Sequence, residues 1–530
     1  MSVAERMGRV GLPEPVGDLA RRRWDAIVVG AGHNGLTAAA YLARAGRSVL
    51  ALERRDVLGG ACTLERPFAD ERYLVSPCAY VVGLLDRLVI DELGLAERGY
   101  RVFPADPNLW VPLPDGTSYA SFLDPDRTAA HMRENGFSEA DIRGRFAYEE
   151  AFERCRVLLR EGPGGDTWLG SSPGRERIEE ILGHDPELIS IVFEASIAET
   201  LGRYVEDERL HHALFGQGII GAWAGPRDPG TASVKLMHHQ GQLGEHGSVW
   251  GYVEGGMGRV SFAIAQAAID AGAVIAAGCP VAEILPGEGV VLEDGTRVAS
   301  GVVVSCAEPK RTFSMVPGES VPDDLARRVG GWKTRSAVVK LNAALTRIPE
   351  FTAAGSLRPE KAMVLVTAGL DAAQEGFERA ARGEPGVSYA ELYFQTGYDP
   401  SVAPEGRHLM SAFAQYAPYD LAEGDWDSRR EEIGNRILEV IAAYAPGVHE
   451  CIEHSEVLGP PDIEERMGLT GGQIFQGEAM PDQMWENRFD HRTGIPGLYL
   501  CGAATHPAGS VIALNGRSAA MAVLEDVGRG

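Results

Sequence analysis

The stretch from Asp25 to Gly60, DAIVVGAGHNGLTAAAYLARAGRSVLALERRDVLGG, decides the fold. A short β-branched run at 27–29 leads directly into Gly30-x-Gly32-x-x-Gly35, and an Ala/Leu-rich stretch follows. This pattern predicts a strand, a glycine turn and a helix. The first glycine allows the tight turn, the second lets backbone N–H groups approach a diphosphate, and the third lets the helix pack closely on the strand.

The turn therefore predicts a dinucleotide site, although glycine turns also occur for structural reasons alone. The N-terminus of a helix offers unpaired N–H groups and a favourable dipole to a diphosphate. We expect the cofactor to be lined by the residues of the turn and of the first helical turn: Gly30, Ala31, Gly32, His33, Asn34 and Gly35.

An acidic residue at the right distance strengthens the prediction. A second apolar run at 48–52 ends in Glu53, which stands 23 residues after Gly30. A carboxylate at the end of the second strand can accept both hydroxyls of an adenosine ribose. Arg54 follows directly, and an arginine nearby is the feature that favours a 2′-phosphate, so this alternative stays open.

A glycine pair follows the acidic residue, in Leu58-Gly59-Gly60-Ala61. It resembles the second glycine signature of glutathione-reductase-type flavoproteins, where the pair lies along the diphosphate and ribityl chain. The resemblance implies FAD rather than NAD, with Arg54, Gly59, Gly60 and Ala61 among the residues that bind it.

Composition limits the classes of function. The chain has 530 residues, of which 45% are hydrophobic and 24% charged, which is typical of a soluble enzyme of more than one domain. Its net charge of −25 argues against nucleic acid as a partner. We expect no transmembrane helix and no signal peptide, and therefore a cytoplasmic protein with a loosely packed leader. Peripheral contact with a membrane stays open.

The cysteines and histidines predict no metal site. The seven cysteines form no C-x-x-C pair, which argues against a zinc cluster and a redox-active dithiol. His211-His212 and His238-His239 lack a nearby carboxylate or cysteine at ligand spacing, so we expect ordinary histidines there.

The remaining pattern predicts an interrupted cofactor domain. A helical texture follows Pro125, strands return near 281–304, four alternating strands lie between 337 and 415, and a helix is expected over 511–525. We predict a leader at 1–24, parts of the FAD-binding domain at 25–124, 246–312 and 481–530, a helix-rich cap at 125–245 and a substrate domain at 313–480. The fold class is α/β: a discontinuous Rossmann-type, glutathione reductase-like domain with a mixed antiparallel-sheet and helical substrate domain.

The motifs in this order resemble the phytoene desaturase and retinol saturase group of FAD-dependent oxidoreductases, nearest to its branch of pyridine nucleotide-disulphide oxidoreductase domain-containing proteins. The motifs are GAGHNGL at 30–36, Glu53, LGGA at 58–61, EGGMG at 254–258, VVSCA at 303–307 and LYLCGAATHP at 498–507. The resemblance implies that Val281 meets the adenine, that Ala307 and Gly502 line the cofactor channel, and that Val511 and Ile512 approach the flavin. The chain has Ala508 where family members often have glycine, which argues against a long carotenoid substrate.

The expected activity is removal of a hydride from a C–C or C–N bond of an apolar small molecule, as in a desaturase or dehydrogenase acting on an isoprenoid-like or polyene-like compound. His506, inside the last cofactor motif, is a candidate catalytic residue, with a turn-stabilising role as its alternative. A saturase or double-bond isomerase that uses reduced flavin, and a non-catalytic flavin-bound regulatory partner, stay open. We expect oxygen, a quinone or another protein as electron acceptor. The oligomeric state does not follow from the sequence.

Overall fold

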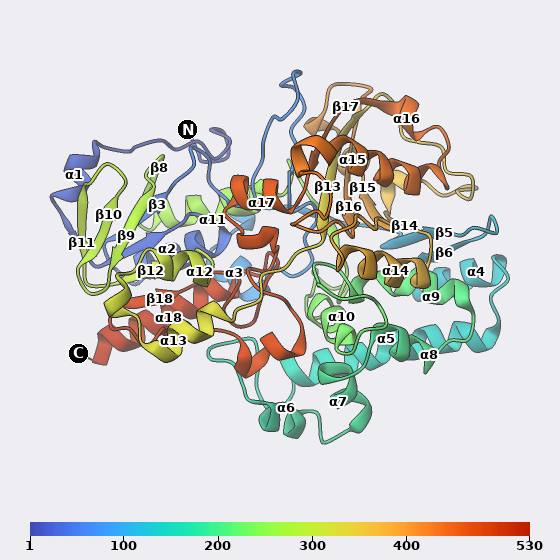
Figure 1. The fold of residues 1–530 in the computed structure, drawn as a ribbon, viewed down its shortest axis with the longest axis horizontal. Coiled ribbons are helices and arrows are strands. Elements are labelled where there is room, and N and C mark those ends of the chain that lie inside the picture. The colour runs from blue at the N-terminus through green and yellow to red at the C-terminus, as the bar shows by residue number, and fades with distance from the viewer. Residues whose placement is uncertain (530) are drawn as a thin grey trace.

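The computed structural model describes residues 1–529. A parallel sheet and a larger, mostly antiparallel sheet lie in different parts of the molecule, and a group of helices lies beside the larger sheet (Figure 1). Within the described residues, no helix combines the length and the apolar character needed to cross a bilayer.

Five parallel strands form the sheet that carries the glycine turn, in the order β18-β12-β2-β3-β8. Their bounds are β2 Ala26–Val29, β3 Val49–Glu53, β8 Val274–Ala277, β12 Val303–Ser305 and β18 Leu498–Leu500. The four residues of β2 and the five of β3 are all buried, as expected for strands covered on both faces. The predicted Rossmann-type domain is confirmed, and strands from the beginning, the middle and the end of the chain lie in one sheet.

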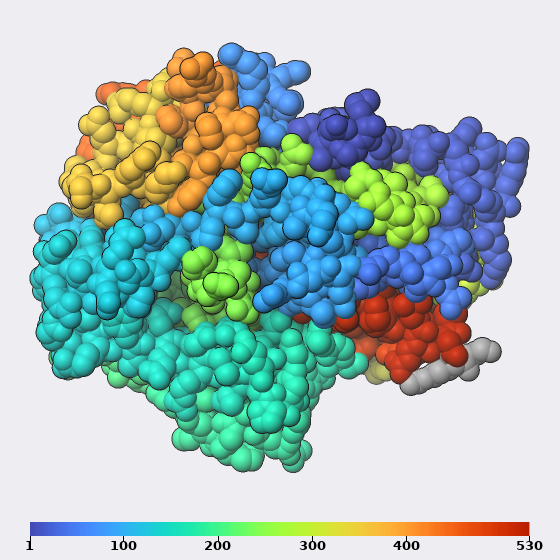
Figure 2. All heavy atoms as spheres, turned by 180° about the vertical axis from the view of Figure 1, so that it is seen from behind, coloured from blue at the N-terminus to red at the C-terminus, as the bar shows by residue number. Residues whose placement is uncertain are grey.

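Three helices pack together beside this sheet: α2 (His33–Arg44), α11 (Gly258–Asp270) and α18 (Leu514–Arg529). The final helix begins three residues later than predicted. Ala513 has φ of 67°, which a helix does not allow, and Ile512 O accepts a hydrogen bond from Asp86 N–H at 3.2 Å. The space-filling view from behind shows the blue N-terminal part and the red C-terminal helix against each other (Figure 2).

The leader is ordered, contrary to the expectation of loose packing. Its strand β1 (Arg23–Trp24) belongs to a four-stranded sheet with β9 (Val281–Leu285), β10 (Gly289–Leu292) and β11 (Arg297–Ser300), and its helix α1 (Val16–Ala20) contacts β11. Val3 and Leu19 are buried, and Trp24 Nε1 donates to Leu19 O at 3.1 Å. A few apolar side chains along the leader are buried, although its many charged residues indicated an exposed segment.

Seven strands form the second sheet, in the order β17-β13-β16-β15-β14-β5-β6. Four of them match the strands predicted between 337 and 415, and every pair is antiparallel except β14–β5. The bounds are β5 Leu109–Pro112, β6 Ser118–Ser121, β13 Val338–Leu345, β14 Met363–Thr367, β15 Tyr389–Tyr393, β16 His408–Gln415 and β17 Ile452–Leu458. The β5–β6 hairpin thus joins this sheet rather than the parallel one, although its residues lie within 25–124. Two further strands, β4 (Val102–Pro104) and β7 (Gly251–Val253), pair with each other.

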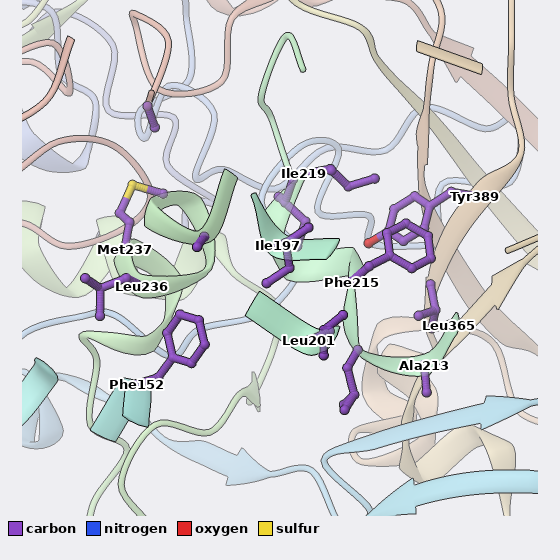
Figure 3. Close-up of a cluster of buried hydrophobic side chains, with 14 of the residues drawn as sticks. Phe152, Ile197, Leu201, Ala213, Phe215, Ile219, Leu236, Met237, Leu365 and Tyr389 are labelled. Atoms are coloured by element: carbon purple, nitrogen blue, oxygen red, sulfur yellow. The ribbon is translucent and has the colours of Figure 1, made fainter. Parts of the chain in front are cut away.

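The helix-rich segment contains α4 to α10, and five of these helices begin at a Ser or Asp whose side chain accepts a backbone N–H. The bounds are α4 Pro125–Glu134, α5 Glu139–Arg160, α6 Arg175–Ile181, α7 Pro186–Phe193, α8 Ile197–Gly202, α9 Glu208–Leu214 and α10 Thr231–His239. Their apolar faces share one core with the seven-stranded sheet, where Phe215 lies against Tyr389 and Leu365 (Figure 3).

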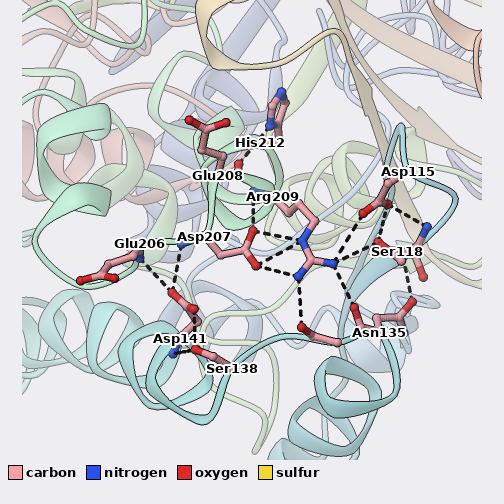
Figure 4. Close-up of polar contacts among 12 residues, drawn as sticks. Asp115, Ser118, Asn135, Ser138, Asp141, Glu206, Asp207, Glu208, Arg209 and His212 are labelled. Atoms are coloured by element: carbon pink, nitrogen blue, oxygen red, sulfur yellow. Dashed lines mark hydrogen bonds and ion pairs between the residues drawn. The ribbon is translucent and has the colours of Figure 1, made fainter.

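A polar cluster ties this segment to the β5–β6 turn. The Arg209 guanidinium contacts the carboxylates of Asp207 and Asp115, and it donates to Asn135 O at 3.0 Å (Figure 4).

The other helices are α3 Arg87–Glu92, α12 Pro309–Ser314, α13 Asp323–Gly330, α14 Leu370–Ala380, α15 Trp426–Ala442, α16 Val448–Cys451 and α17 Pro460–Met467. Isoleucines of α15 pack on the seven-stranded sheet.

Candidate active site

The glycine turn has the conformation that the sequence predicts. Gly30 adopts φ of 93°, and a Cβ on Gly35 would lie 2.0 Å from Gly30 O, so the helix could not approach the strand with any larger residue. Because α2 begins at His33, the N–H groups of its first turn have no acceptor within the helix. These groups are suited to an anionic diphosphate.

Glu53 and the second glycine signature meet this turn. Glu53 Oε2 accepts the Ala31 N–H at 2.8 Å and Oε1 accepts the Arg55 N–H at 2.9 Å, which fixes the buried carboxylate at the end of β3. Gly59 N–H donates to Ala31 O at 2.9 Å, and a Cβ on Gly59 would lie 2.4 Å from Cys62 O. The two signatures therefore form one continuous wall.

This wall lines a cavity of ≈ 770 Å³. Most of the residues predicted to bind the cofactor line it: Gly30, Gly32, His33, Asn34, Glu53, Arg54, Gly59, Gly60, Ala61, Val281, Ala307 and Val511. Four others lie behind the wall: Ala31, Gly35, Gly502 and Ile512. Arg54 donates to the carbonyl groups of Glu465 and Arg466 at 2.8 and 3.2 Å, at the end of α17.

The residues present fit a flavin dinucleotide. His33 and Asn34 line the cavity, and His33 Nε2 and Asn34 Oδ1 are buried without a hydrogen-bond partner in the described chain. The glycines leave a cradle that side chains would fill, and the Glu53 carboxylate stands beside it. FAD would supply hydroxyl, phosphate and ring groups to these atoms.

His506 lies away from the cavity wall. Its Nε2 is 2.5 Å from Thr167 O, and burial lowers the pKa of its imidazole to about 4, so the ring is neutral and donates to that carbonyl. This geometry favours the turn-stabilising role over the catalytic one.

Gln476 closes the cofactor end of the cavity, and no motif in the sequence pointed to it. Its Nε2 donates to Cys306 O at 3.1 Å, and a Cβ on Gly502 would lie 2.3 Å from its Oε1. That Cβ would also lie 2.7 Å from Cys306 O, so a close approach of the backbone, rather than direct contact with a cofactor, accounts for glycine at 502. Cys306 and Cys501 directly follow the paired strands β12 and β18, and all seven cysteines are free thiols.

The opposite wall of the cavity comes from the seven-stranded sheet and carries a buried lysine. Lys340 of β13 is 2% exposed, its Nζ donates to Ser411 Oγ at 2.7 Å, and it lies 3.7 Å from the centre of the Tyr80 ring. Burial lowers the pKa of Lys340 to about 7, against the opposing influence of Cys78, Glu391 and Glu456. At neutral pH, a large fraction of this amine is unprotonated.

A buried carboxylate shares this wall. Glu391 of β15 is 3% exposed and accepts a hydrogen bond from the Tyr393 hydroxyl, and burial raises the pKa of Glu391. The rings of Tyr80 and Tyr393 lie with their centres 4.1 Å apart. Phe413, Trp250 and Phe475 complete an aromatic lining. The cavity thus has a polar cofactor end and an aromatic end with one amine and one carboxyl group.

Comparison with known proteins identifies the family. The model of the NAD(P)-binding Rossmann-like domain matches residues 28–81, and that of the flavin-containing amine oxidoreductases matches residues 174–524. The chain belongs to the flavin-containing amine oxidoreductase family. It is accordingly an FAD-dependent oxidoreductase, and this agrees with the cavity described above.

Relatives extend along almost the whole chain. Pyridine nucleotide-disulfide oxidoreductase domain-containing protein 2 of Mus musculus is 34% identical over 95% of this chain and 94% of its own length, which confirms the branch predicted from the motifs. A limonene dehydrogenase polypeptide of Castellaniella defragrans is 25% identical over 96% and 95% of the two chains. Phytoene desaturase (lycopene-forming) of Pseudescherichia vulneris is 23% identical over 94% and 99%.

A solved structure shows the same fold. Putrescine oxidase bound to putrescine superposes with a TM-score of 0.58 at 17% identity, covering 96% of this chain and 100% of the other. Within residues 1–529, no group of three or more His, Cys, Asp or Glu side chains is placed to hold a metal ion.

Proposed function

We propose that this flavoprotein oxidises a compact amine with an apolar body, removing a hydride from the carbon next to nitrogen. The observation that carries the proposal is the pair Lys340 and Glu391 on the aromatic wall of the cofactor cavity. FAD, when bound, supplies the acceptor for the hydride. The glycine turn and Glu53 hold its diphosphate and its adenosine ribose.

Lys340 prepares the substrate. Amines arrive mostly as ammonium ions, and only the neutral amine has the lone pair that stabilises the cation formed as hydride leaves. A lysine whose pKa is about 7 can take the ammonium proton at neutral pH, since the base form is then well populated. The products are an iminium ion, protonated Lys340 and the transferred hydride. Water hydrolyses the iminium ion after release.

Glu391 and the aromatic rings recognise the substrate. The carboxyl group can accept an N–H of the amine, beside the rings of Tyr80 and Tyr393, which pack on each other. The rings of Phe413, Trp250 and Phe475 pack on the apolar body and exclude water. Cavities of about 300–1,000 Å³ are typical of single ligand sites, so a volume of ≈ 770 Å³ that must also hold FAD favours a compact substrate over a long polyene.

Anaerobic mixing tests the proposal. Purified protein with bound FAD is mixed with cyclohexylamine or benzylamine, and in parallel with cyclohexene or limonene. We expect an amine to bleach the flavin and Lys340→Met to bleach at least 100-fold more slowly, the lower range for loss of a positioned acid or base.

Bleaching by the hydrocarbons alone would favour dehydrogenation of a C–C bond, the activity that the name limonene dehydrogenase suggests for one relative. Isomerisation or saturation only after prior reduction of the flavin would favour the isomerase or saturase alternative. Bound FAD with no reaction in any mixture would favour a regulatory partner protein. Each of these outcomes contradicts amine oxidation.

The fate of the electrons belongs to the same proposal. Electrons taken from the substrate would leave the bound FAD to oxygen, a quinone or another protein. We also propose a cytoplasmic location with peripheral contact to a membrane surface, and an apolar small molecule rather than a nucleic acid as partner.

A further inference from the structure

A chain of hydrogen bonds leads away from Lys340 behind the cavity wall. Lys340 and Asn342 lie two residues apart on β13, and Asn342 faces Ser411 on the neighbouring strand β16. Lys340 Nζ donates to Ser411 Oγ at 2.7 Å, and Ser411 Oγ donates to Asn342 Oδ1 at 2.9 Å. Lys340 and Asn342 are 2% and 1% exposed, and Ser411 between them is partly buried.

Asn342 fixes the direction of the chain. Its Nδ2 donates to Pro77 O at 3.1 Å and to Glu456 Oε1 at 3.2 Å, two groups that only accept. The amide oxygen must therefore face Ser411, and the serine hydroxyl must donate to it. The lone pairs of Ser411 are then free to accept from Lys340.

Ion pairs anchor the far end. Arg466 Nη1 donates to Glu456 Oε2 at 2.9 Å, and the same guanidinium pairs with Glu65, which also pairs with Arg55. Arg55 lines the cofactor cavity. Glu456 is held in place by this network, and Asn342 is held by Glu456.

We propose that Ser411, aligned by Asn342 and Glu456, is the positioning residue that holds the Lys340 nitrogen on the cavity wall. This hydrogen bond directs the other N–H bonds of the nitrogen and, in the neutral amine, its lone pair toward the substrate. The chemical meaning of this arrangement rests on the proposed function, in which Lys340 takes a proton from the substrate. Ser411 itself does not contact the reacting atoms.

The proton affinity of Lys340 depends on several groups. Glu391 faces the Lys340 amine from β15, Glu456 from β17, and Cys78 and Tyr80 from the loop that follows Pro77. Tyr393 lies beside Glu391 and Tyr80. Ser411 is the group that accepts a hydrogen bond from its nitrogen at 2.7 Å. A serine that accepts from the charged amine stabilises the charged form, so its loss should lower the pKa of Lys340 further.

The composition of the chain makes this measurable, because it has five lysines, at positions 235, 310, 333, 340 and 361. Protein with bound FAD is prepared with lysine labelled with carbon-13 at Cε, and the five signals are titrated by NMR. Lys340→Met identifies the signal of Lys340. We expect its midpoint to fall by about one pH unit in Ser411→Ala, the equivalent of one hydrogen bond to a charged group.

Two variants serve as controls. Ser411→Thr keeps the hydroxyl and should restore the midpoint. Ser455→Ala removes an exposed serine of the same sheet and should leave the midpoint unchanged. If Ser411→Ala does not fold, Ser411→Cys keeps a side chain of similar size with a weaker acceptor and should lower the midpoint in the same direction.

An unchanged Lys340 midpoint in the Ser411 variants overturns the positioning role, whatever the substrate is. A lowered midpoint that Ser411→Thr does not restore also overturns it. A lowered and restored midpoint supports the role, even if no amine bleaches the flavin, and that last result would reject the proposed function alone.

Discussion

Glu53 combines a structural and a binding task in one carboxylate. Its two oxygens accept backbone N–H groups of Ala31 and Arg55, which orient the carboxylate at the end of β3. Each oxygen keeps a further lone pair for a ribose hydroxyl. The exposed Arg54 donates to carbonyl groups at the end of α17, so the structure gives it a partner other than a 2′-phosphate.

Glu53→Ala should weaken FAD binding. Hydrogen bonds that involve a charged group contribute about 1.5–3 kcal/mol each, so the loss of one to the ribose lowers affinity about 10- to 100-fold. Equilibrium binding of FAD to the apoprotein, followed by flavin fluorescence, measures this. Asp56→Ala removes an exposed carboxylate nearby and is the matched control. Equal affinities for Glu53→Ala and the wild type would contradict the assignment.

The glycines and Glu53 could be predicted because they act within one local unit, where spacing along the chain determines geometry. Lys340 and Glu391 could not be predicted, because they meet only through the pairing of β13, β16 and β15. The one indication in the sequence is a lysine within the mostly apolar run 338–345, all of which is buried in the structure. Sequence indicates that such a strand exists, but not which strands become its neighbours.

At the scale of elements, the prediction of strands was more accurate than that of their arrangement. The hairpin of β5 and β6 was predicted, yet its parallel pairing with β14 depends on a contact between segments about 250 residues apart. The leader was misjudged for a similar reason. Its few apolar residues are spaced to reach a sheet formed much later in the chain.

Leu19→Ala tests whether the leader contributes to stability. Leu19 is 1% exposed and packs with Trp24 in the core of the four-stranded sheet, so its truncation should cost about 2–5 kcal/mol. Urea unfolding of the FAD-bound protein measures the loss. Leu12→Ala, at a side chain that is 50% exposed, should cost far less. Equal free energies of unfolding for Leu19→Ala and the wild type would show that packing of the leader does not contribute to stability.

At the scale of the whole molecule, the cavity is a product of both sheets. The parallel sheet, assembled from distant parts of the chain, provides the cofactor wall, and the seven-stranded sheet provides Lys340, Glu391 and part of the aromatic wall. Neither wall is sufficient for the proposed reaction. In the proposed reaction, the cofactor wall holds FAD, and Lys340 and Glu391 of the other wall serve as the base and the carboxyl group that select an amine.

The pH dependence of anaerobic flavin reduction tests this account most directly. The limiting rate constant at saturating amine, taken with the amine that bleaches FAD fastest, reports groups in the complex. With the pKa of Lys340 at about 7, the rate constant should fall as pH drops below about 7, since Lys340 becomes protonated, and should level off above it. In Lys340→Met, the fall of the rate constant at low pH should disappear, and flavin reduction should be about 10²–10⁴-fold slower. A rate constant independent of pH, or a Lys340→Met variant as fast as the wild type, would contradict the account.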